Sequence, residues 1–389
     1  MGVPIRYNIR SLLERKATTA MTAFGIALTV AVLVITLALI SGLRATFAAS
    51  GHPLQAVVVR KGLTSELASS ITQEAVNEIR ALPQLQRNAD GQPLASPEIV
   101  SVINLVSVDS PSGMNVGVRG LLPVGGEMRG IRIQSGRMFS PGQRELIVGA
   151  GIAKRYPTAQ IGSKLRFGRG DWIVVGVFSG SDNASAIASE IWCDLNQFRA
   201  DLDRQGGVSS LLVRAQSTGA LENLITSIDT NRRLNASALN QTQYYASMTK
   251  SGAPLEVLGF MIATVMAIGS GFGAMNTMYA AVSRRSREIA TLRALGFTRG
   301  SILRSFIAES VALSLFGGIL GCILALPVNN MTTGVGNFDT FSEIAFNFTI
   351  TPTIMLYGLT FAGVIGAAGG YLPARSAARR DLITTLREG

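Results

Sequence analysis

Few residues in this 389-residue chain have the types and spacing that catalysis or metal binding needs. The chain has one histidine, His52, and two cysteines, Cys193 and Cys322. One histidine without a cysteine cluster supplies too few donors for a zinc site, and no Gly-x-Ser-x-Gly or His-Glu-x-x-His motif is present. The run Ile161–Lys164 (Ile-Gly-Ser-Lys) lacks the order of the Gly-x-x-x-x-Gly-Lys-[Ser/Thr] phosphate loop. We therefore expect no catalytic residue, no metal and no cofactor in this chain.

The distribution of charged residues is more informative than any single candidate. Only 15% of the residues are charged and 47% are hydrophobic, whereas a soluble domain has about 25% charged residues. Four stretches contain no Asp, Glu, Lys or Arg: Ala17–Leu43, Val257–Ser283, Ser310–Phe338 and Ile344–Ala374. Each exceeds the roughly 20 residues that a helix needs to cross a bilayer. We predict transmembrane helices at residues 18–43, 257–282, 305–328 and 353–372, which excludes a soluble enzyme and a many-spanning transporter.

The net charge of +11 follows the predicted membrane topology. Lys and Arg gather before the first span, between the second and third spans and in the C-terminal tail, whereas Asn329–Pro352 contains neither. Positively charged short loops face the cytoplasm, and long translocated domains do not count. We expect both termini in the cytoplasm and the long segment 44–254 outside it. Membrane orientation accounts for the basic charge, and no nucleic-acid partner is expected.

The segment outside the spans has two parts with different patterns. Residues 1–17 predict a cytoplasmic amphipathic helix in the headgroup layer, or else a simple extension of the first span. Residues 44–254 alternate strand and helix signals, beginning with a strand at Leu54–Arg60 and a helix capped by Thr64 or Ser65. The expected fold class is an α-helical membrane protein with four transmembrane helices and a large extracytoplasmic α+β domain in two lobes.

The connection after the second span combines basic and apolar residues. Residues 284–296 predict a short amphipathic helix under the membrane, with Gly296 as its stop. Such a helix either anchors to headgroups or receives a push from a cytoplasmic partner. The candidate coupling residues are Arg284, Arg285, Arg287, Glu288, Ile289, Leu292, Arg293, Leu295, Gly296 and Phe297.

Three glycine pairs lie in the last three spans with Gly-x-x-x-Gly spacing. Close backbone approach at such pairs holds helices together in lipid. The packing is either within one four-helix unit or across a dimer. The pairs are Gly269/Gly273, Gly317/Gly321 and Gly366/Gly370.

The connection also resembles a known family signature. Arg284–Phe297 (Arg-Arg-Ser-Arg-Glu-Ile-Ala-Thr-Leu-Arg-Ala-Leu-Gly-Phe) is similar to the R-x-x-E-I-[GA]-x-L-[RK]-A-[LI]-G-[AF] pattern of MacB/FtsX-type ABC transporter permeases. Asn8–Lys16 resembles the family's N-terminal segment, and Tyr371–Arg379 resembles its ending. In the outer segment, Glu145–Gly149 through Val174–Phe178 resembles the MacB-type periplasmic pattern.

The resemblance implies a permease domain at 255–389, a MacB-like periplasmic domain at 44–254, and a bacterial inner-membrane location. It implies mechanotransmission, in which ATP and Mg bound by a separate ABC ATPase subunit drive the periplasmic domains for efflux or for lipoprotein or lipid release, as in the LolC/LolE arrangement. The implied partners are the ATPase, a second permease protomer (identical or different), and a periplasmic adaptor (membrane fusion protein) or lipoprotein. The alternative is an FtsX-like, non-transporting regulator or scaffold that signals to extracytoplasmic enzymes.

Overall fold

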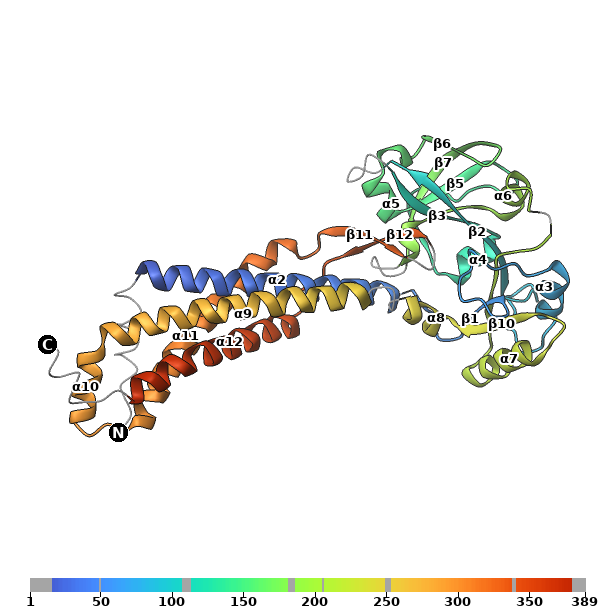
Figure 1. The fold of residues 1–389 in the computed structure, drawn as a ribbon. Coiled ribbons are helices and arrows are strands. Elements are labelled where there is room, and N and C mark those ends of the chain that lie inside the picture. The colour runs from blue at the N-terminus through green and yellow to red at the C-terminus, as the bar shows by residue number, and fades with distance from the viewer. Residues whose placement is uncertain are drawn as a thin grey trace. The chain divides into compact units, whose positions relative to one another are not determined.

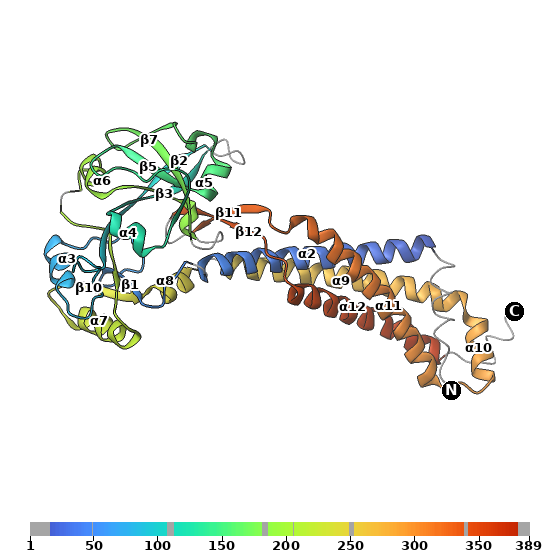
Figure 2. The ribbon, with the colours of Figure 1, turned by 180° about the vertical axis from the view of Figure 1, so that it is seen from behind.

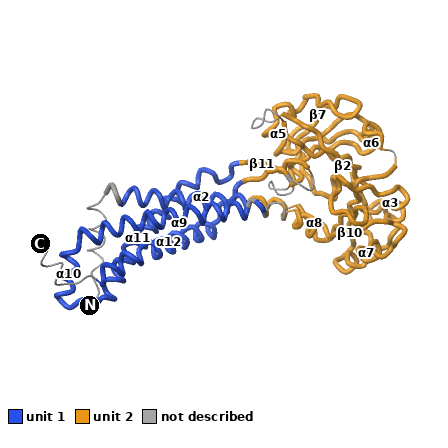
Figure 3. Tube along the Cα trace, viewed as in Figure 1, with its two compact units in different colours: residues 1–41, 254–331, 348–389 blue, residues 42–253, 332–347 orange. Residues whose placement is uncertain are grey.

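The computed structural model describes residues 16–48, 50–106, 113–180, 186–204, 206–248, 253–337 and 341–379. The chain divides into two compact units, shown in Figure 3. Unit 1 comprises residues 1–41, 254–331 and 348–389, and unit 2 comprises residues 42–253 and 332–347. The predicted headgroup helix at 1–17 lies almost wholly outside the described residues.

Unit 1 is built from four long apolar helices and one short helix. The long helices are α2 (Lys16–Ala48), α9 (Ala253–Arg284), α11 (Arg299–Ala325, extended by the 3-10 turn Leu326–Val328) and α12 (Pro352–Arg379). All four are long and apolar enough to cross a membrane. The short α10 (Ser286–Ala294) lies between α9 and α11. In Figures 1 and 2, α11 and α12 run side by side.

The transmembrane helices pack through small and branched residues. Ile26, Val30 and Val34 of α2 form one cluster with residues of α11 and α12. The hydroxyl groups of Thr22 and Thr277 lie 2.7 Å apart and join α2 to α9. Because lipid gives no hydrophobic drive for helix association, such close packing and hydrogen bonds hold the bundle together.

Unit 2 contains one mixed sheet of ten strands. The strand order is β10-β1-β9-β2-β3-β8-β5-β7-β4, and β6 pairs with β7. β3 and β8 run parallel, as do β5 and β7, and the other pairings are antiparallel. The strands are β1 (Gln55–Arg60), β2 (Ala95–Leu105), β3 (Met114–Leu121), β4 (Arg132–Gly136), β5 (Glu145–Gly149), β6 (Lys164–Phe167), β7 (Gly170–Ser179), β8 (Glu190–Asp194), β9 (Ser210–Arg214) and β10 (Ala236–Asn240).

Short helices cover different parts of this sheet. Figures 1 and 2 show α3 and α7 near β1 and β10, and α5 and α6 near β5 and β7. One large apolar core runs from Val58 through Ile99 and Val118 to Trp172. The helices are α3 (Gln73–Arg80), α4 (Pro123–Met128), α5 (Ala150–Arg155), α6 (Leu195–Asp201), α7 (Thr218–Thr230) and α8 (Gln241–Met248), with 3-10 turns η1 (Pro157–Ala159) and η2 (Ala186–Ser189).

Two features of unit 2 differ from the sequence predictions. The first helix begins at Gln73 with Thr72 as its N-cap, so the predicted caps Thr64 and Ser65 are wrong. The reason is that Ile71, which lies between the predicted caps and Gln73, pairs with Val208 in a β-bridge and is not part of the helix.

The second difference is a hairpin between α11 and α12. β11 (Thr332–Asn337) and β12 (Ser342–Asn347) pair antiparallel. They belong to unit 2, although the predicted boundary at residue 255 assigns them to the permease domain.

Candidate functional site

The predicted coupling helix is joined to α9 by a break at Arg285. α9 ends at Arg284, α10 begins at Ser286, and Arg285 between them has φ −102° and ψ 15°. Its guanidinium Nη1 lies 3.4 Å from Oε2 of Glu309 on α11, and the two side chains are only 8% and 4% exposed. Arg285 therefore points into the bundle, and an ion pair fixes the break between the two helices to α11.

The apolar residues of α10 do not form one exposed stripe. Ile289 and Ala290 are buried, and Ile289 packs with Val282 of α9, Phe306 of α11 and Ala377 of α12. Leu295, by contrast, is 73% exposed, because it lies at the C-cap where the helix ends. Gly296 follows with φ +94°, the left-handed conformation that favours glycine.

The remaining predicted coupling residues divide by exposure. Leu292, Arg293 and Phe297 are half-buried. An exposed face remains on and beside α10, and we call it the α10 face: Arg284, Arg287, Glu288 and Leu295.

The six predicted packing glycines lie in two different surroundings. A Cβ on Gly317 would lie 2.7 Å from the backbone oxygen of Ala23, and Gly321 approaches α2 in the same way. Gly366 and Gly370 lie against Ser314 and Ser310 of α11. A Cβ on Gly269 or Gly273 of α9 would meet no atom within 4 Å beyond the adjoining turns of its own helix in the described structure. Two pairs thus serve packing within this chain, whereas the α9 pair faces open space.

The β11–β12 hairpin is anchored in unit 2 through a buried glutamate. The Glu343 carboxylate accepts hydrogen bonds from the Arg155 guanidinium and the Tyr156 hydroxyl. The Glu343 side chain is 3% exposed and that of Arg155 is 11% exposed. Nearby, the Ala345 backbone N–H donates to Ser189 Oγ at 2.8 Å. The hairpin that joins α11 to α12 is therefore held to α5 and η2.

Sequence reasoning did not identify Glu343 as functional. One signal was available, since Glu343 and Asp339 are the only charged residues in the connection Asn329–Pro352. Its partners Arg155 and Tyr156 are distant in sequence, and only the fold brings them together.

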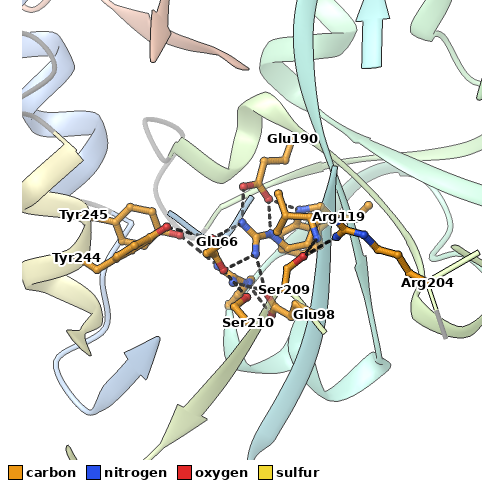
Figure 4. A network of polar contacts seen from close by, with 12 residues as sticks. Glu66, Glu98, Arg119, Glu190, Arg204, Ser209, Ser210, Tyr244 and Tyr245 are labelled. Carbon is orange, nitrogen blue, oxygen red and sulfur yellow. Dashed lines mark hydrogen bonds and ion pairs between the residues drawn. The ribbon is translucent and has the colours of Figure 1, made fainter. Parts of the chain in front are cut away.

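A second anchor is a buried charge network around Arg119, shown in Figure 4. The Arg119 guanidinium donates to Glu66 at 3.0 Å, to Glu98 at 2.6 Å and to Glu190 at 2.8 Å. Burial by itself raises the pKa of Glu66, but the charge and hydrogen bonds of Arg119, the charge of Arg129 and the hydrogen bond from Ser210 together lower that pKa to about 2. The guanidinium thus keeps a buried carboxylate ionised.

This network also holds α8, the helix that leads into α9. The Tyr244 hydroxyl donates to Glu66 Oε2 at 3.3 Å, and Arg129 Nη1 donates to the Tyr245 hydroxyl at 3.2 Å. Burial raises the pKa of both tyrosines. Both hydroxyl groups therefore stay protonated, so the Tyr244 hydroxyl keeps the proton that it donates to Glu66.

The end of α2 is attached to unit 2 as well. Ser50 Oγ accepts a hydrogen bond from the Ala186 backbone N–H at 2.8 Å, and the His52 N–H donates to Gln241 Oε1 at 2.9 Å. Inside unit 2, the segment after α2, the helix before α9 and the hairpin between α11 and α12 thus each have a polar anchor.

Within the described ranges, no group of three or more His, Cys, Asp or Glu side chains could hold a metal ion. The three glutamates of the network are occupied by Arg119 and Arg129. Cys193 and Cys322 are free and buried, and burial raises the pKa of the Cys193 thiol.

Known proteins match both parts of the chain. Residues 19–231 match the MacB-like periplasmic core domain and residues 260–382 match the FtsX-like permease C-terminal domain. The macrolide export ATP-binding/permease protein MacB of Bordetella avium is 27% identical over 98% of this chain and 59% of its own length. The uncharacterized ABC transporter permease YknZ of Bacillus subtilis is 35% identical over 38% of this chain and 36% of its own.

The crystal structure of the periplasmic region of MacB from Actinobacillus actinomycetemcomitans covers 50% of this chain and 92% of its own, with 12% identity and a TM-score of 0.37. The chain spans about three fifths of the length of the Bordetella relative.

Proposed function

Because this chain belongs to the family that joins a MacB-like periplasmic core domain to an FtsX-like permease C-terminal domain, we propose that it is the permease subunit of an ABC transporter. We assign ATP hydrolysis to a partner ATPase, because the two matching domains are a periplasmic core domain and a permease domain. The subunit lies in the bacterial inner membrane, with both termini and α10 in the cytoplasm and unit 2 in the periplasm.

The observation that carries this proposal is the construction of α10. Its inner side is fixed to α9, α11 and α12 by Ile289 and by the Arg285–Glu309 pair, while the α10 face stays exposed. A helix that is fixed to three transmembrane helices and exposed on its other side can receive a force and pass it on. We assign the α10 face to contact with the ATPase.

Transmission needs connections that hold at the other end as well. The Ser50, Tyr244 and Glu343 anchors hold the segments of unit 2 that adjoin α2, α9, α11 and α12. In the proposed mechanism, ATP-driven movement of the transmembrane helices moves unit 2 without passing cargo through the bilayer. The cargo is an exported compound or a lipid-bearing substrate delivered with a periplasmic adaptor or lipoprotein. The open Gly269/Gly273 face of α9 suits a second permease protomer.

The test is co-purification of the partner ATPase with single-residue variants. Fully burying a leucine contributes about 1.5–3 kcal/mol, so Leu295→Asp should weaken ATPase binding at least tenfold while the chain still inserts. Glu288→Ala should weaken it less. Ile161→Asp, which alters an exposed apolar residue of unit 2, serves as the matched control.

Two results would overturn the proposal. One is wild-type ATPase binding and transport by Leu295→Asp. The other is ATP hydrolysis by the purified chain alone.

A further inference from the structure

A small polar cavity lies in unit 2 beside the end of α2. Its volume is about 160 Å³, and its lining includes His52, Gln55, Glu127, Arg129, Arg214 and Gln241. That volume equals roughly five water molecules in the liquid, and drug-sized ligands occupy pockets of about 300–1,000 Å³. The cavity therefore suits a ligand much smaller than a macrolide.

One wall of the cavity carries a cation without a carboxylate partner. Arg214 Nη2 donates to the Met128 backbone oxygen at 2.7 Å, and its Nε is buried without a hydrogen-bond partner in the described structure. Arg129, the other arginine, is already paired with Glu98 at 2.6 Å. Arg214 is thus the group in this wall that an anion would satisfy.

His52 adds a neutral donor next to Arg214. Its Nδ1 accepts a hydrogen bond from the Leu54 N–H at 3.2 Å, which assigns the ring proton to Nε2. Partial burial and then the charge of Arg214 lower the pKa of His52. The neutral ring is therefore the form that faces a ligand.

The cavity also offers acceptors. Gln55 is fully buried, and its Nε2 donates to the Met128 backbone oxygen at 2.7 Å. Its Oε1 has no partner among the described residues. The exposed Glu127 adds a carboxylate. A buried acceptor without a donor is unfavourable, and an ammonium group would satisfy it.

We propose that this cavity binds a phosphoethanolamine group, with the phosphate on Arg214 and His52 Nε2–H and the ammonium on Gln55 Oε1 and Glu127. The group carries a phosphate and an ammonium within a few atoms, and the lining holds both an arginine without a carboxylate partner in the described structure and acceptor oxygens. It is offered either by a soluble compound or by a lipid headgroup. The cavity-lining residues begin at Ser50, six residues after Arg44, the charged residue that ends the uncharged run Ala17–Leu43.

The experiment is calorimetric titration of the purified full-length protein with O-phosphoethanolamine, inorganic phosphate and ethanolamine in turn. Phosphoethanolamine should bind at least tenfold more tightly than either half. Glu127→Gln, at an exposed position, should lose at least fivefold in affinity and Arg214→Gln at least tenfold. Glu222→Gln and Arg232→Gln, exposed charges outside the cavity, should bind as the wild type does.

The source of the group is decided with the protein in nanodiscs. If phosphatidylethanolamine nanodiscs block binding of the soluble compound and phosphatidylglycerol nanodiscs do not, the site takes a lipid headgroup. Equal binding in both assigns a soluble compound. The proposal is overturned if phosphate alone binds as tightly as phosphoethanolamine, or if Glu127→Gln binds like the wild type. No ATPase enters these measurements, so their outcome is independent of the proposed permease role.

Discussion

The hairpin anchor can be tested by adding a single methyl group at Gly334 on β11. A Cβ built on Gly334 would overlap Glu343 Oε1 and Arg155 Nη1, the two atoms that form the buried ion pair. Gly334→Ala must therefore displace the pair. Gly336, two residues along the same strand, has nothing within 4 Å of its Cβ position, so Gly336→Ala is the matched control.

The expected magnitude follows from what must move. Forcing an extra methyl into a packed site costs about 1–3 kcal/mol, and losing one partner of a buried ion pair costs about 3–5 kcal/mol. Replacing glycine by alanine also lowers the conformational entropy of the unfolded chain, which stabilises the folded state by about 0.4–1 kcal/mol. This contribution is common to both variants. We expect Gly334→Ala to favour the undocked hairpin by about 1–3 kcal/mol more than Gly336→Ala does.

The assay is amide hydrogen exchange of β11 and β12 in the full-length protein. Since 1.4 kcal/mol corresponds to a factor of ten, exchange in Gly334→Ala should be roughly 5 to 150 times faster than in Gly336→Ala. Under the proposed permease role, transport should also fall with the loss of docking. Equal exchange in the two variants would refute the reasoning, because it would mean that the Glu343 pair does not hold the hairpin.

Two further predictions concern buried charges. The folded-state pKa of Glu66 is about 2, below its ordinary 4.5, so its contribution to stability is present above pH 4.5 and is lost as the pH falls toward 2; urea unfolding across this range should show the decline. In Arg119→Met, burial should raise the pKa of Glu66 above its ordinary value. The free energy of unfolding of this variant should therefore increase, not decrease, as Glu66 becomes protonated at lower pH. In the bundle, Arg285→Leu should lower the free energy of unfolding by about 3–5 kcal/mol, and the double variant Arg285→Leu/Glu309→Leu should recover most of it. Thermal unfolding in detergent checks this, and a double variant no better than the single one would contradict the pairing.

The transmembrane helices were predictable because their signal is local. An uncharged run longer than 20 residues has few alternatives to a membrane-spanning helix, and α2, α9, α11 and α12 all lie on such runs. Strands with branched apolar residues, such as β1 and β7, were predictable for the same reason. β4 was not predicted, because all five of its residues are exposed and show no alternation. It lies at the end of the strand order, paired only with β7 among the described strands.

The candidate site was predictable only in outline. Charge and the glycine stop indicated a short helix at 284–296, but they could not tell which residues face the bundle. Ile289 and Leu295 belong to one stripe in the sequence pattern, and the structure separates them because the helix ends at Ala294. The partners of Arg285 and Glu343 depend on the packing of distant segments, which no local pattern contains.

The docked hairpin also imposes an order on biogenesis. Residues 332–347 are synthesised only after α9 and α11, yet they complete the unit that begins at residue 42. Until α11 has been inserted in its final orientation, Arg155 and Tyr156 lack the carboxylate of Glu343 that joins them in the finished fold. A nascent chain whose third span inserted wrongly would leave that surface uncovered. Docking of the hairpin therefore requires that α11 has already been inserted.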